Sequence, residues 1–411
     1  MTEAWIIDAC RTPRGIGKAG KGALSSMHPQ HLGAAVLKAI AERNKINTAE
    51  VDDIIWGTSS QRGTQGGDLG RMAALDAGYD VKSSAVTLDR FCGSGITSVN
   101  IAASSVMSGM EDLVLAGGTE MMSTYGQDGN TPSPFIDNGN TRLRSEHPQP
   151  HQGVCADAIA TLEGIDREAV DALAFVSQQN ADKAIKGGHF DKSLIPVYNA
   201  EGELVLDKEE FPRPQTTLEG LAELKASFES LADYPLDEQG STFRKLVLQK
   251  YPDLKINHVH HAGNSSGVVD GAAALLLASP NYAKANGMKP RARIKAMANM
   301  GDSPTLMLNA PVPAAKKVLE KANLTIDDID LFEVNEAFSV VTEKFIRDLN
   351  IDRDKINVNG GAMALGHPIG ATGSILVGTV LDELERRDLQ FGLVTMCAAG
   401  GMAPAVIIER V

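Results

Sequence analysis

Residues 85–109 read "AVTLDRFCGSGITSVNIAASSVMSG" and decide the fold, because they join a strand-like run to an apolar helix through a glycine-rich turn. The turn carries Cys92 at the point where the helix begins. The spacing puts four apolar residues on one helical face, Ile96, Val99, Ala103 and Val106. The stretch therefore predicts a strand, a tight turn and a helix in immediate succession.

The same unit occurs again near the other end of the chain. In the first copy, "EVDDIIWGTSS" (50–60) leads into the turn and helix, and "EDLVLAGGTEM" (111–121) follows them. In the second copy, "TIDDIDLFEVNEAF" (325–338) leads to "KINVNGGAMALGHPIGATGSILVGTVLDELERR" (355–387) and then to "QFGLVTMCAAGGM" (390–402). Self-similarity of this kind indicates a duplication. We therefore predict two layered α/β halves packed together.

Each unit ends in a short apolar strand, expected at 112–116 and at 393–396, which the following glycines stop. Such strands suit the middle of a sheet covered on both faces. The sequence between the units is charged and punctuated by proline, apart from a helix expected at 167–186. Connecting segments of this composition commonly carry substrate-binding surface.

The chain is accordingly expected to have three parts. The N-terminal half comprises 1–118 together with about 258–285, and the C-terminal half comprises 286–411. An inserted loop domain, 119–257, is expected to form the substrate-binding surface.

Composition narrows the class of protein. A chain of 411 residues with 43% hydrophobic content can bury a large core, and a net charge of −13 argues against a nucleic-acid partner. Four scattered cysteines are too few for a disulfide framework and favour a reducing compartment. The sequence shows neither a secretory leader nor an apolar run long enough for a bilayer, so a cytoplasmic protein is expected.

Cys92 is a candidate nucleophile because of its place at the start of a helix. The positive end of the helix dipole is expected to stabilise its thiolate, and Gly93 and Gly95 are expected to leave room for a substrate carbonyl. The alternative is a small apolar residue at a packed turn, since free cysteines are usually buried and inert. The local sequence does not separate the two interpretations.

The second unit supplies partners for such a thiol. It places His367 on a glycine-rich loop before a helix, Cys397 at the end of a buried strand, and Asn335 and Glu336 at a third strand end. A nucleophilic thiol needs a base within hydrogen-bond reach, and an amide can orient a water or a carbonyl. Duplication would bring these strand ends toward Cys92. A capped loop histidine, a core cysteine and a turn asparagine are the structural alternatives.

These residues belong to a series of motifs that resembles the thiolases, which make and break the carbon–carbon bond of 3-oxoacyl-coenzyme A. The motifs span nearly the whole chain, in the family's order: "DACRTPRG", "LDRFCGSGITSV", "LAGGTEMMS", "EEFPRPQTTLEGLAELK", "AGNSSGVVDGAAALLL", "VNEAF", "NGGAMALGHPIGATG" and "CAAGG". The resemblance implies a duplicated fold of α-β-α-β-α layers with an inserted loop domain for coenzyme A. It also implies an acyltransferase of fatty-acid and lipid metabolism that forms a homodimer or homotetramer.

The resemblance also implies a role for each catalytic residue. Cys92 would take the acyl group as a thioester, with His367 as its base. Cys397 would remove the α-proton of acetyl-coenzyme A, or return a proton in the cleavage direction. His367 and a water held by Asn335 would form one oxyanion hole, and the backbone N–H groups of Cys92 and Ala399 the other.

Four further residues are implied to contact the substrate. Ser266 resembles a serine beside the pantetheine arm, Arg213 an arginine beside the nucleotide, and His151 a histidine near the acyl thioester, while Phe338 lies in the "VNEAF" motif. From the residues alone, Arg213 could equally be a solvated loop residue and Ser266 a helix cap. Coenzyme A is expected as substrate and product, with no permanently bound cofactor and no metal.

The chain departs from the thiolase pattern in three places. Where many members have methionine, glycine and later glutamate, this chain has Gln152, Gly153 and Asp157, which suggests a more polar wall for the acyl pocket. Ala399 replaces a frequent glycine, which would be restrictive if φ were positive there. The stretch 229–256 is longer than usual and either covers the substrate entrance or is a surface excursion.

Two alternatives lie within the wider superfamily. A decarboxylating ketoacyl synthase would use one cysteine and two histidines, and a protein that only binds acyl-coenzyme A would lack the nucleophile or its base. The motif "CAAGG" with Cys92 and His367 favours a thiolase over both. The "HVHHAG" histidines (258–263) have no paired cysteines at ligand spacing and are not expected to bind metal. Cys10 and Cys155 are expected to be structural.

Overall fold

The computed structural model describes residues 3–127, 129–130, 133 and 135–411. Its centre is a ten-stranded sheet with the order β10-β11-β12-β9-β1-β8-β5-β3-β4, with β2 paired to β8. The strands of the N-terminal half are β1 (Trp5–Arg11), β2 (Gly15–Ile16), β3 (Asp53–Gly57), β4 (Val86–Leu88), β5 (Leu113–Met121) and β8 (Val269–Ala278). Those of the C-terminal half are β9 (Ala292–Gly301), β10 (Leu331–Val334), β11 (Phe391–Thr395) and β12 (Met402–Arg410).

The pairing pattern repeats in the two halves of the sheet. β3 runs parallel to β5, β5 antiparallel to β8, and β8 antiparallel to β1. β10 likewise runs parallel to β11, β11 antiparallel to β12, and β12 antiparallel to β9. Ile356 adds a parallel bridge to Phe332, at the position that β4 occupies beside β3. The predicted duplication is therefore present, and the halves join where Trp5 and Ile6 of β1 pair with β9.

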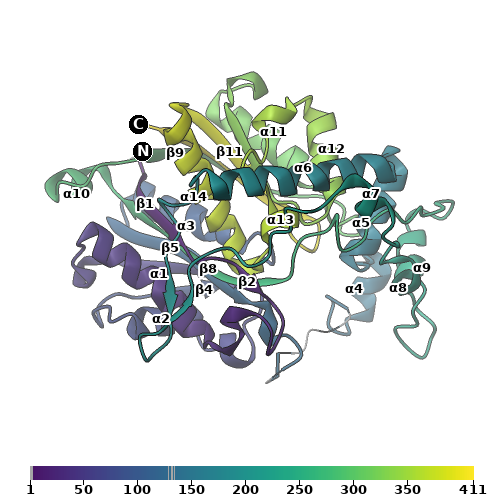
Figure 1. Ribbon diagram of the computed structural model, residues 1–411, viewed down its shortest axis with the longest axis horizontal. Helices are drawn as coiled ribbons and strands as arrows, with labels where there is room; N and C mark the ends of the chain where they lie inside the picture. Colours follow the sequence, from purple (N-terminus) through teal and green to yellow (C-terminus); the bar gives the residue numbers. More distant parts are fainter. Residues whose placement is uncertain (1–2, 128, 131–132, 134) are drawn as a thin grey trace.

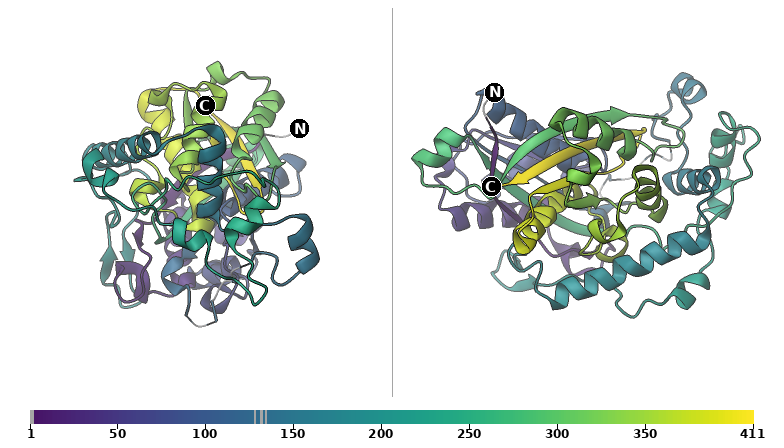
Figure 2. Two further views of the ribbon diagram at one scale, coloured as in Figure 1. Left: turned by 90° about the vertical axis from the view of Figure 1, so that its right-hand side faces the viewer. Right: turned by 90° about the horizontal axis from the view of Figure 1, so that it is seen from above.

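Helices form three layers around the two halves of the sheet (Figures 1 and 2). Two helices lie between the halves, α3 (Ser94–Ser108) and α14 (Ile369–Arg387). The outer helices of the N-terminal half are α1 (Pro29–Asn44) and α2 (Leu69–Asp76), and those of the C-terminal half are α11 (Pro311–Ala322) and α12 (Ser339–Leu349). One hydrophobic cluster joins Val99 of α3 and Val380 of α14 to Val114 of β5 and Val406 of β12. The layers thus alternate α-β-α-β-α.

Glycines allow the central helices to touch. A Cβ on Gly95 would lie 2.7 Å from the backbone nitrogen of Ser374, and one on Gly373 would lie 2.1 Å from the nitrogen of Ile96. The glycines of "AGG" do not stop the first predicted strand, because β5 continues through Gly117 to Met121. A Cβ on Gly117 would strike the ring of Trp56 at 2.4 Å, so this glycine serves packing within the sheet.

The inserted segment forms short helices and a small hairpin beside the layers. It contains α4 (Thr141–Glu146), α5 (Gln152–Glu163), α6 (Arg167–Lys186), β6 (Val197–Tyr198), β7 (Leu204–Leu206), α7 (Leu218–Ala222), α8 (Glu229–Ala232) and α9 (Phe243–Leu248). The long helix α6 has the predicted bounds and crosses the front of the molecule in Figure 1, where α4, α5, α8 and α9 lie at the right-hand end. Two short helices remain, α10 (Pro280–Ala285) and α13 (Ala362–Leu365). No helix within the described residues has the length and apolar character needed to cross a membrane.

Candidate active site

Cys92 lies in a strained turn between β4 and α3. The preceding residue, Phe91, has a φ of 50°, a left-handed conformation that is costly for an aromatic residue. Its N–H donates to Oδ1 of Asp89 at 2.6 Å, and its carbonyl accepts from the Ser94 hydroxyl at 2.7 Å. Gly93 caps the helix, so Cys92 lies directly before the N-terminus, as predicted.

The two glycines beside Cys92 face protein rather than substrate. A Cβ on Gly93 would lie 2.9 Å from the Pro404 ring and 3.4 Å from the Ala398 side chain, and Gly95 packs on α14. The expectation that these glycines make room for a substrate carbonyl is therefore wrong. The contact of Gly93 with Ala398 instead places the Cys92 turn against the residue that follows Cys397. Cys397 is also one of the groups that raise the pKa of Cys92.

His367 is fixed by its backbone and by one hydroxyl. Its N–H donates to the Gly267 carbonyl at 2.9 Å. Nδ1 lies 2.6 Å from the Thr372 hydroxyl, which itself donates to the Pro368 carbonyl at 2.9 Å. Because the hydroxyl proton is used, the Thr372 oxygen accepts from Nδ1–H, and Nε2 is left as the proton acceptor. Sequence reasoning missed Thr372, although its place one turn into the following helix could have indicated it.

Asn335 meets this acceptor from the end of β10. Its amide Nδ2 lies 3.3 Å from Nε2 of His367, and its backbone N–H donates to the carbonyl of Thr395, the last residue of β11, two residues before Cys397. Oδ1 of Asn335 is buried and has no partner within the described chain. Asn335 thus lies against His367 and keeps one oxygen without a partner. A buried acceptor of this kind can bind a water.

Burial sets the charge state of the site. It raises the pKa of the Cys92 thiol, an effect that the nearby Cys397 and Glu120 increase and that the residue's own backbone N–H opposes. Burial also raises the pKa of Cys397 to about 12 and lowers that of His367 to about 3. The expected thiolate at the helix start is therefore not the resting form. The site rests as neutral thiols and a neutral imidazole.

Glu120 ties the two halves together behind the cysteine. This fully buried carboxylate accepts from the N–H groups of Ser59 and Gly370, both at 2.8 Å, and from the side chains of Gln65 and Tyr125, both at 3.1 Å. Gly370 is the second residue of α14 and lies three residues after His367. An acid in the apolar, glycine-rich strand "LVLAGGTEM" was the available signal, which sequence reasoning did not use.

The turn after Cys397 does not require a positive φ at Ala399. Its left-handed conformations fall on Gly400 and Gly401, with φ of 81° and 76°, and Ala399 is not among the positive-φ residues. The N–H of Ala398 donates to the Met402 carbonyl at 2.7 Å. Within the described chain, no backbone carbonyl accepts from the N–H of Ala399. Alanine is therefore tolerated at 399.

Arg213 is exposed and lines a small cavity. The cavity has a volume of about 200 Å³ and is also lined by Gly263 of "AGNSSG" and by Met363, just before the loop of His367. The guanidinium lies 5.5 Å from the centroid of the Phe211 ring. A role for Arg213 beside the nucleotide stays a prediction.

Ser266 lies between two catalytic loops. Its N–H donates to the Ala337 carbonyl at 3.0 Å, and the neighbouring Ser265 forms an antiparallel bridge with Phe338. Ser266 caps no helix in the structure. The "AGNSSG" segment therefore brings Ser266 and Phe338 to the strand end that carries Asn335.

His151 is the N-cap of α5 and borders the turn after Cys397. Its Nδ1 accepts from the Gly153 N–H at 3.1 Å, and burial lowers its pKa. Two residues earlier, the Gln149 side chain lies 3.7 Å from the Cβ position of Gly400. Gln152 is exposed, and a Cβ on Gly153 would meet the Phe228 ring at 2.4 Å.

The "HVHHAG" histidines are hydrogen-bonded to Asp157 and Asp171. Nδ1 of His258 and Nδ1 of His260 lie 2.6 and 2.7 Å from the two oxygens of Asp157, and Nε2 of His261 lies 2.9 Å from Asp171. Asp157 is thus internally paired, and Gln152 is exposed. A more polar acyl wall stays a prediction. Within the described chain, no group of three or more His, Cys, Asp or Glu residues could hold a metal ion.

The other two cysteines contact only backbone carbonyls. Cys10 donates to the Val36 carbonyl at 3.4 Å, and Cys155 donates to the Thr305 carbonyl at 3.3 Å. Both are buried and free. Neither bond involves a catalytic residue, which agrees with a structural role.

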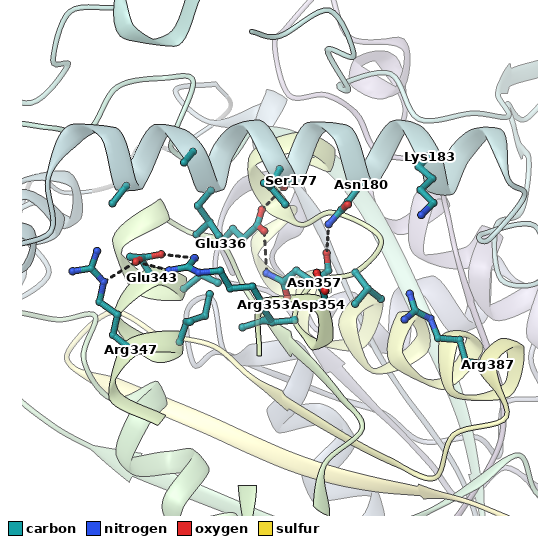
Figure 3. A pocket seen from close by; sticks show the side chains of 18 residues that line it. Ser177, Asn180, Lys183, Glu336, Glu343, Arg347, Arg353, Asp354, Asn357 and Arg387 are labelled. Atoms are coloured by element: carbon teal, nitrogen blue, oxygen red, sulfur yellow. Dashed lines mark hydrogen bonds and ion pairs between the residues drawn. The ribbon is translucent and has the colours of Figure 1, made fainter. Parts of the chain in front are cut away.

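A cavity of about 690 Å³ lies away from the cysteines, between α6, α12 and the end of α14 (Figure 3). Its arginines are already paired. Arg347 and Arg353 contact Glu343 at 2.7 and 2.8 Å, and Arg387 contacts Glu383. The volume of a cavity therefore does not mark the catalytic centre in this protein.

Matches to known proteins agree with the fold and this arrangement of residues. Residues 4–231 match the family model described as "Thiolase, N-terminal domain", and residues 288–410 match "Thiolase, C-terminal domain". The chain belongs to the thiolase family.

Individual relatives resemble the chain over its whole length. A β-ketoadipyl-CoA thiolase of Acinetobacter baylyi is 38% identical over 433 residues, covering 100% of both chains. A steroid 3-ketoacyl-CoA thiolase of Mycobacterium tuberculosis is 38% identical, covering 100% of this chain and 95% of the relative. The crystal structure of human mitochondrial 3-ketoacyl-CoA thiolase superposes with a TM-score of 0.84 at 31% identity, covering 100% and 99% of the two chains.

Proposed function

We propose that this thiolase transfers acyl groups between coenzyme A thioesters in a ping-pong reaction, condensing or cleaving 3-oxoacyl-coenzyme A through a thioester on Cys92. The observation that carries the proposal is the meeting of the α3 turn, the α14 turn and the ends of β10 and β11. In support, Asn335 lies 3.3 Å from His367, and the Cys92 turn packs through Gly93 on Ala398, the residue after Cys397. Proteins named 3-ketoacyl-CoA thiolase and acetyl-CoA acetyltransferase among the relatives support an acyltransferase.

The first half-reaction begins from neutral groups. Nε2 of His367 takes the proton of Cys92 as the sulfur attacks the acyl carbonyl. The backbone N–H groups of Cys92 and Ala399 stabilise the tetrahedral oxyanion. The leaving coenzyme A thiolate takes the proton of Cys397. The acyl-enzyme then holds an imidazolium at His367 and a thiolate at Cys397, and the two charges form together.

The second half-reaction uses both charges. The Cys397 thiolate removes the α-proton of acetyl-coenzyme A, and the enolate oxygen is stabilised by Nε2–H of His367 and a water on Asn335. The enolate carbon attacks the Cys92 thioester and forms the carbon–carbon bond. Cys92 leaves as a thiolate and recovers its proton from His367, so that all protons balance. The cleavage direction reverses these steps.

The substrate path is proposed from Arg213, Ser266, His151 and Phe338. Arg213 would face the nucleotide, Ser266 and Phe338 the pantetheine arm, and His151 the acyl thioester. The inserted domain 119–257 would supply most of this surface, between halves formed by 1–118 with about 258–285 and by 286–411. Coenzyme A would act as substrate and product, without a permanent cofactor.

The setting of the enzyme is also a proposal. It would work as a cytoplasmic homodimer or homotetramer in fatty-acid and lipid metabolism. Bacterial relatives named 3-ketoacyl-CoA thiolase support this setting.

Acylation by acetyl-coenzyme A tests the proposal directly. Intact-mass measurement on the wild type should show one acetyl adduct per chain, and Cys92→Ala should show none. The absence of an adduct in the wild type, or an adduct that persists in Cys92→Ala, would contradict the assignment.

A further inference from the structure

The segment 228–256, here called the roof segment, lies at the surface but packs a few side chains into a hydrophobic cluster. Its helices α8 and α9 pack on each other and on α5. Phe243, Leu246 and Val247 are at most 4% exposed. They share one hydrophobic cluster with Cys397, and Ala399 packs against this cluster. The roof segment is therefore continuous with the wall of the active site.

Two phenylalanines of the roof segment enclose His151. The ring centroid of Phe228 lies 5.7 Å from that of His151, and that of Phe243 lies 5.5 Å from it. Phe228 also meets Phe338 edge to face at 5.7 Å. Centroid separations of this size are direct ring contacts. The rings therefore fill the space beside His151.

His151 is in turn fixed to the loops around Cys397. The Thr305 hydroxyl donates to the Pro148 carbonyl at 2.8 Å, so the segment before His151 is held against the loop at 302–308. Gly401 packs on the same loop, because a Cβ there would lie 2.6 Å from the Asp302 carbonyl. Phe228 and Phe243 thus pack on His151, and the segment before His151 contacts the same loop as the turn that follows Cys397.

One ion pair and two hydrogen bonds hold the roof segment in place. Arg244 of α9 contacts Asp233 at 2.7 Å and Nε2 of His258 at 3.1 Å. Nδ1 of His258 in turn is hydrogen-bonded to Asp157 of α5 at 2.6 Å. These contacts tie both helices of the roof segment to α5, so that the rings above His151 form a fixed wall.

We propose that Phe228 and Phe243 close the acyl end of the site and restrict the enzyme to short acyl groups. The inference rests on the proposed function and names the substrate class of the same site. A long acyl chain that extends from Cys92 toward His151 must displace a ring that is already packed against His151, which is unfavourable in a close-packed wall. Acetyl and similarly small groups need no such displacement.

Thiolysis of 3-oxoacyl-coenzyme A with four, six, eight and ten acyl carbons tests this restriction. The wild-type kcat/KM should fall by about tenfold or more between four and eight carbons, since pocket fit discriminates strongly per methylene. Phe228→Ala should raise the ratio of eight-carbon to four-carbon activity about tenfold. Tyr234→Ala is the matched control, because Tyr234 lies in the same segment but is 63% exposed.

The outcomes separate the two proposals. A wild-type preference for eight or more carbons would overturn the inference, as would equal ratios in the wild type, Phe228→Ala and Tyr234→Ala. If Phe228→Ala does not fold, Phe228→Leu should shift the ratio in the same direction by a smaller factor, and no shift would overturn the inference. Normal acetylation of Cys92 in these experiments leaves the thiolase mechanism standing, whereas its absence contradicts the mechanism itself.

Discussion

The hydroxyl of Thr372 lies 2.6 Å from Nδ1 of His367 and gives its own proton to the Pro368 carbonyl. This pair assigns the imidazole tautomer without a carboxylate. Catalytic histidines are often oriented by an acidic partner, which would also hold a positive charge on the ring. A hydroxyl orients the ring and leaves it neutral, which suits a site that starts without charges.

Thr372→Val should therefore slow acylation of Cys92 by about 10- to 100-fold, because either ring nitrogen can then carry the proton. Thr372→Ser keeps the hydroxyl and should acylate at nearly the wild-type rate. Rapid-quench measurement of the acetyl burst distinguishes the variants. Equal burst rates for Thr372→Val and the wild type would show that the hydroxyl does not set the tautomer.

The low pKa of His367, about 3, predicts the pH dependence of stability. An unfolded histidine binds a proton below about pH 6.5, whereas folded His367 stays neutral down to about pH 3. Between these values the unfolded state holds more protons, so this residue makes the free energy of unfolding fall as pH falls. The slope from one such group is at most about 1.4 kcal/mol per pH unit.

Urea unfolding of the wild type and of His367→Asn between pH 4.5 and 7 measures this contribution. The variant should lose less stability on acidification than the wild type does. Carboxylates contribute equally to both curves, so the difference in slope reports His367. Parallel curves would mean that the folded histidine titrates normally.

Cys397→Ala should separate the two half-reactions. Acylation of Cys92 by acetyl-coenzyme A should remain measurable by mass, because water can protonate the leaving group. Condensation, and exchange of the α-protons of acetyl-coenzyme A with deuterium, should fall by about 10²- to 10⁴-fold with the loss of the base. Exchange at the wild-type rate would remove Cys397 from the mechanism.

The turn after Cys397 predicts opposite responses at neighbouring positions. Gly401→Ala should lower the free energy of unfolding by about 1–2 kcal/mol or more, because alanine is strained at a φ of 76° and its Cβ would strike two carbonyls. Ala399→Gly should cost about 1 kcal/mol or less and leave turnover intact, since only its N–H is used. Thermal or urea unfolding compares the two variants, and a larger loss for Ala399→Gly would contradict this description of the turn.

Asn335→Ala should lower condensation by about 10²- to 10³-fold, since the enolate would lose the water that Asn335 holds. The acetyl burst should change less, because its oxyanion is bound by backbone N–H groups. Steady-state condensation and burst rates on the same preparation test the difference. Equal losses in both half-reactions would place Asn335 outside the enolate site.

The duplicated halves and the helix start at Cys92 could be predicted because both are local patterns. Periodicity, glycine spacing and repeated order need no knowledge of distant contacts. The glycines show where this reasoning ends. Gly93 was expected to face substrate, and its actual neighbours, Pro404 and Ala398, lie more than three hundred residues away along the chain.

The charge state of the catalytic groups also could not be predicted from the sequence. The dipole at the start of α3 predicted a thiolate, but burial by both halves determines the pKa of Cys92. The sequence did not predict Thr372 as the partner of His367, or Glu120 as the partner of Gly370, because tertiary packing brings these groups together. The packing of the Phe228 ring on Gly153 likewise depends on tertiary contacts that the sequence does not show.

The interlocked glycines of the two central helices have a consequence for the history of the gene. Gly95 and Gly373 each leave no space for even a methyl group, so each half has been shaped to the backbone of the other. Separately expressed halves would have to find that match between two chains, with apolar helix faces open to aggregation. The duplication thus produced one inseparable folding unit, and we expect split or permuted versions to fail unless these helices stay joined.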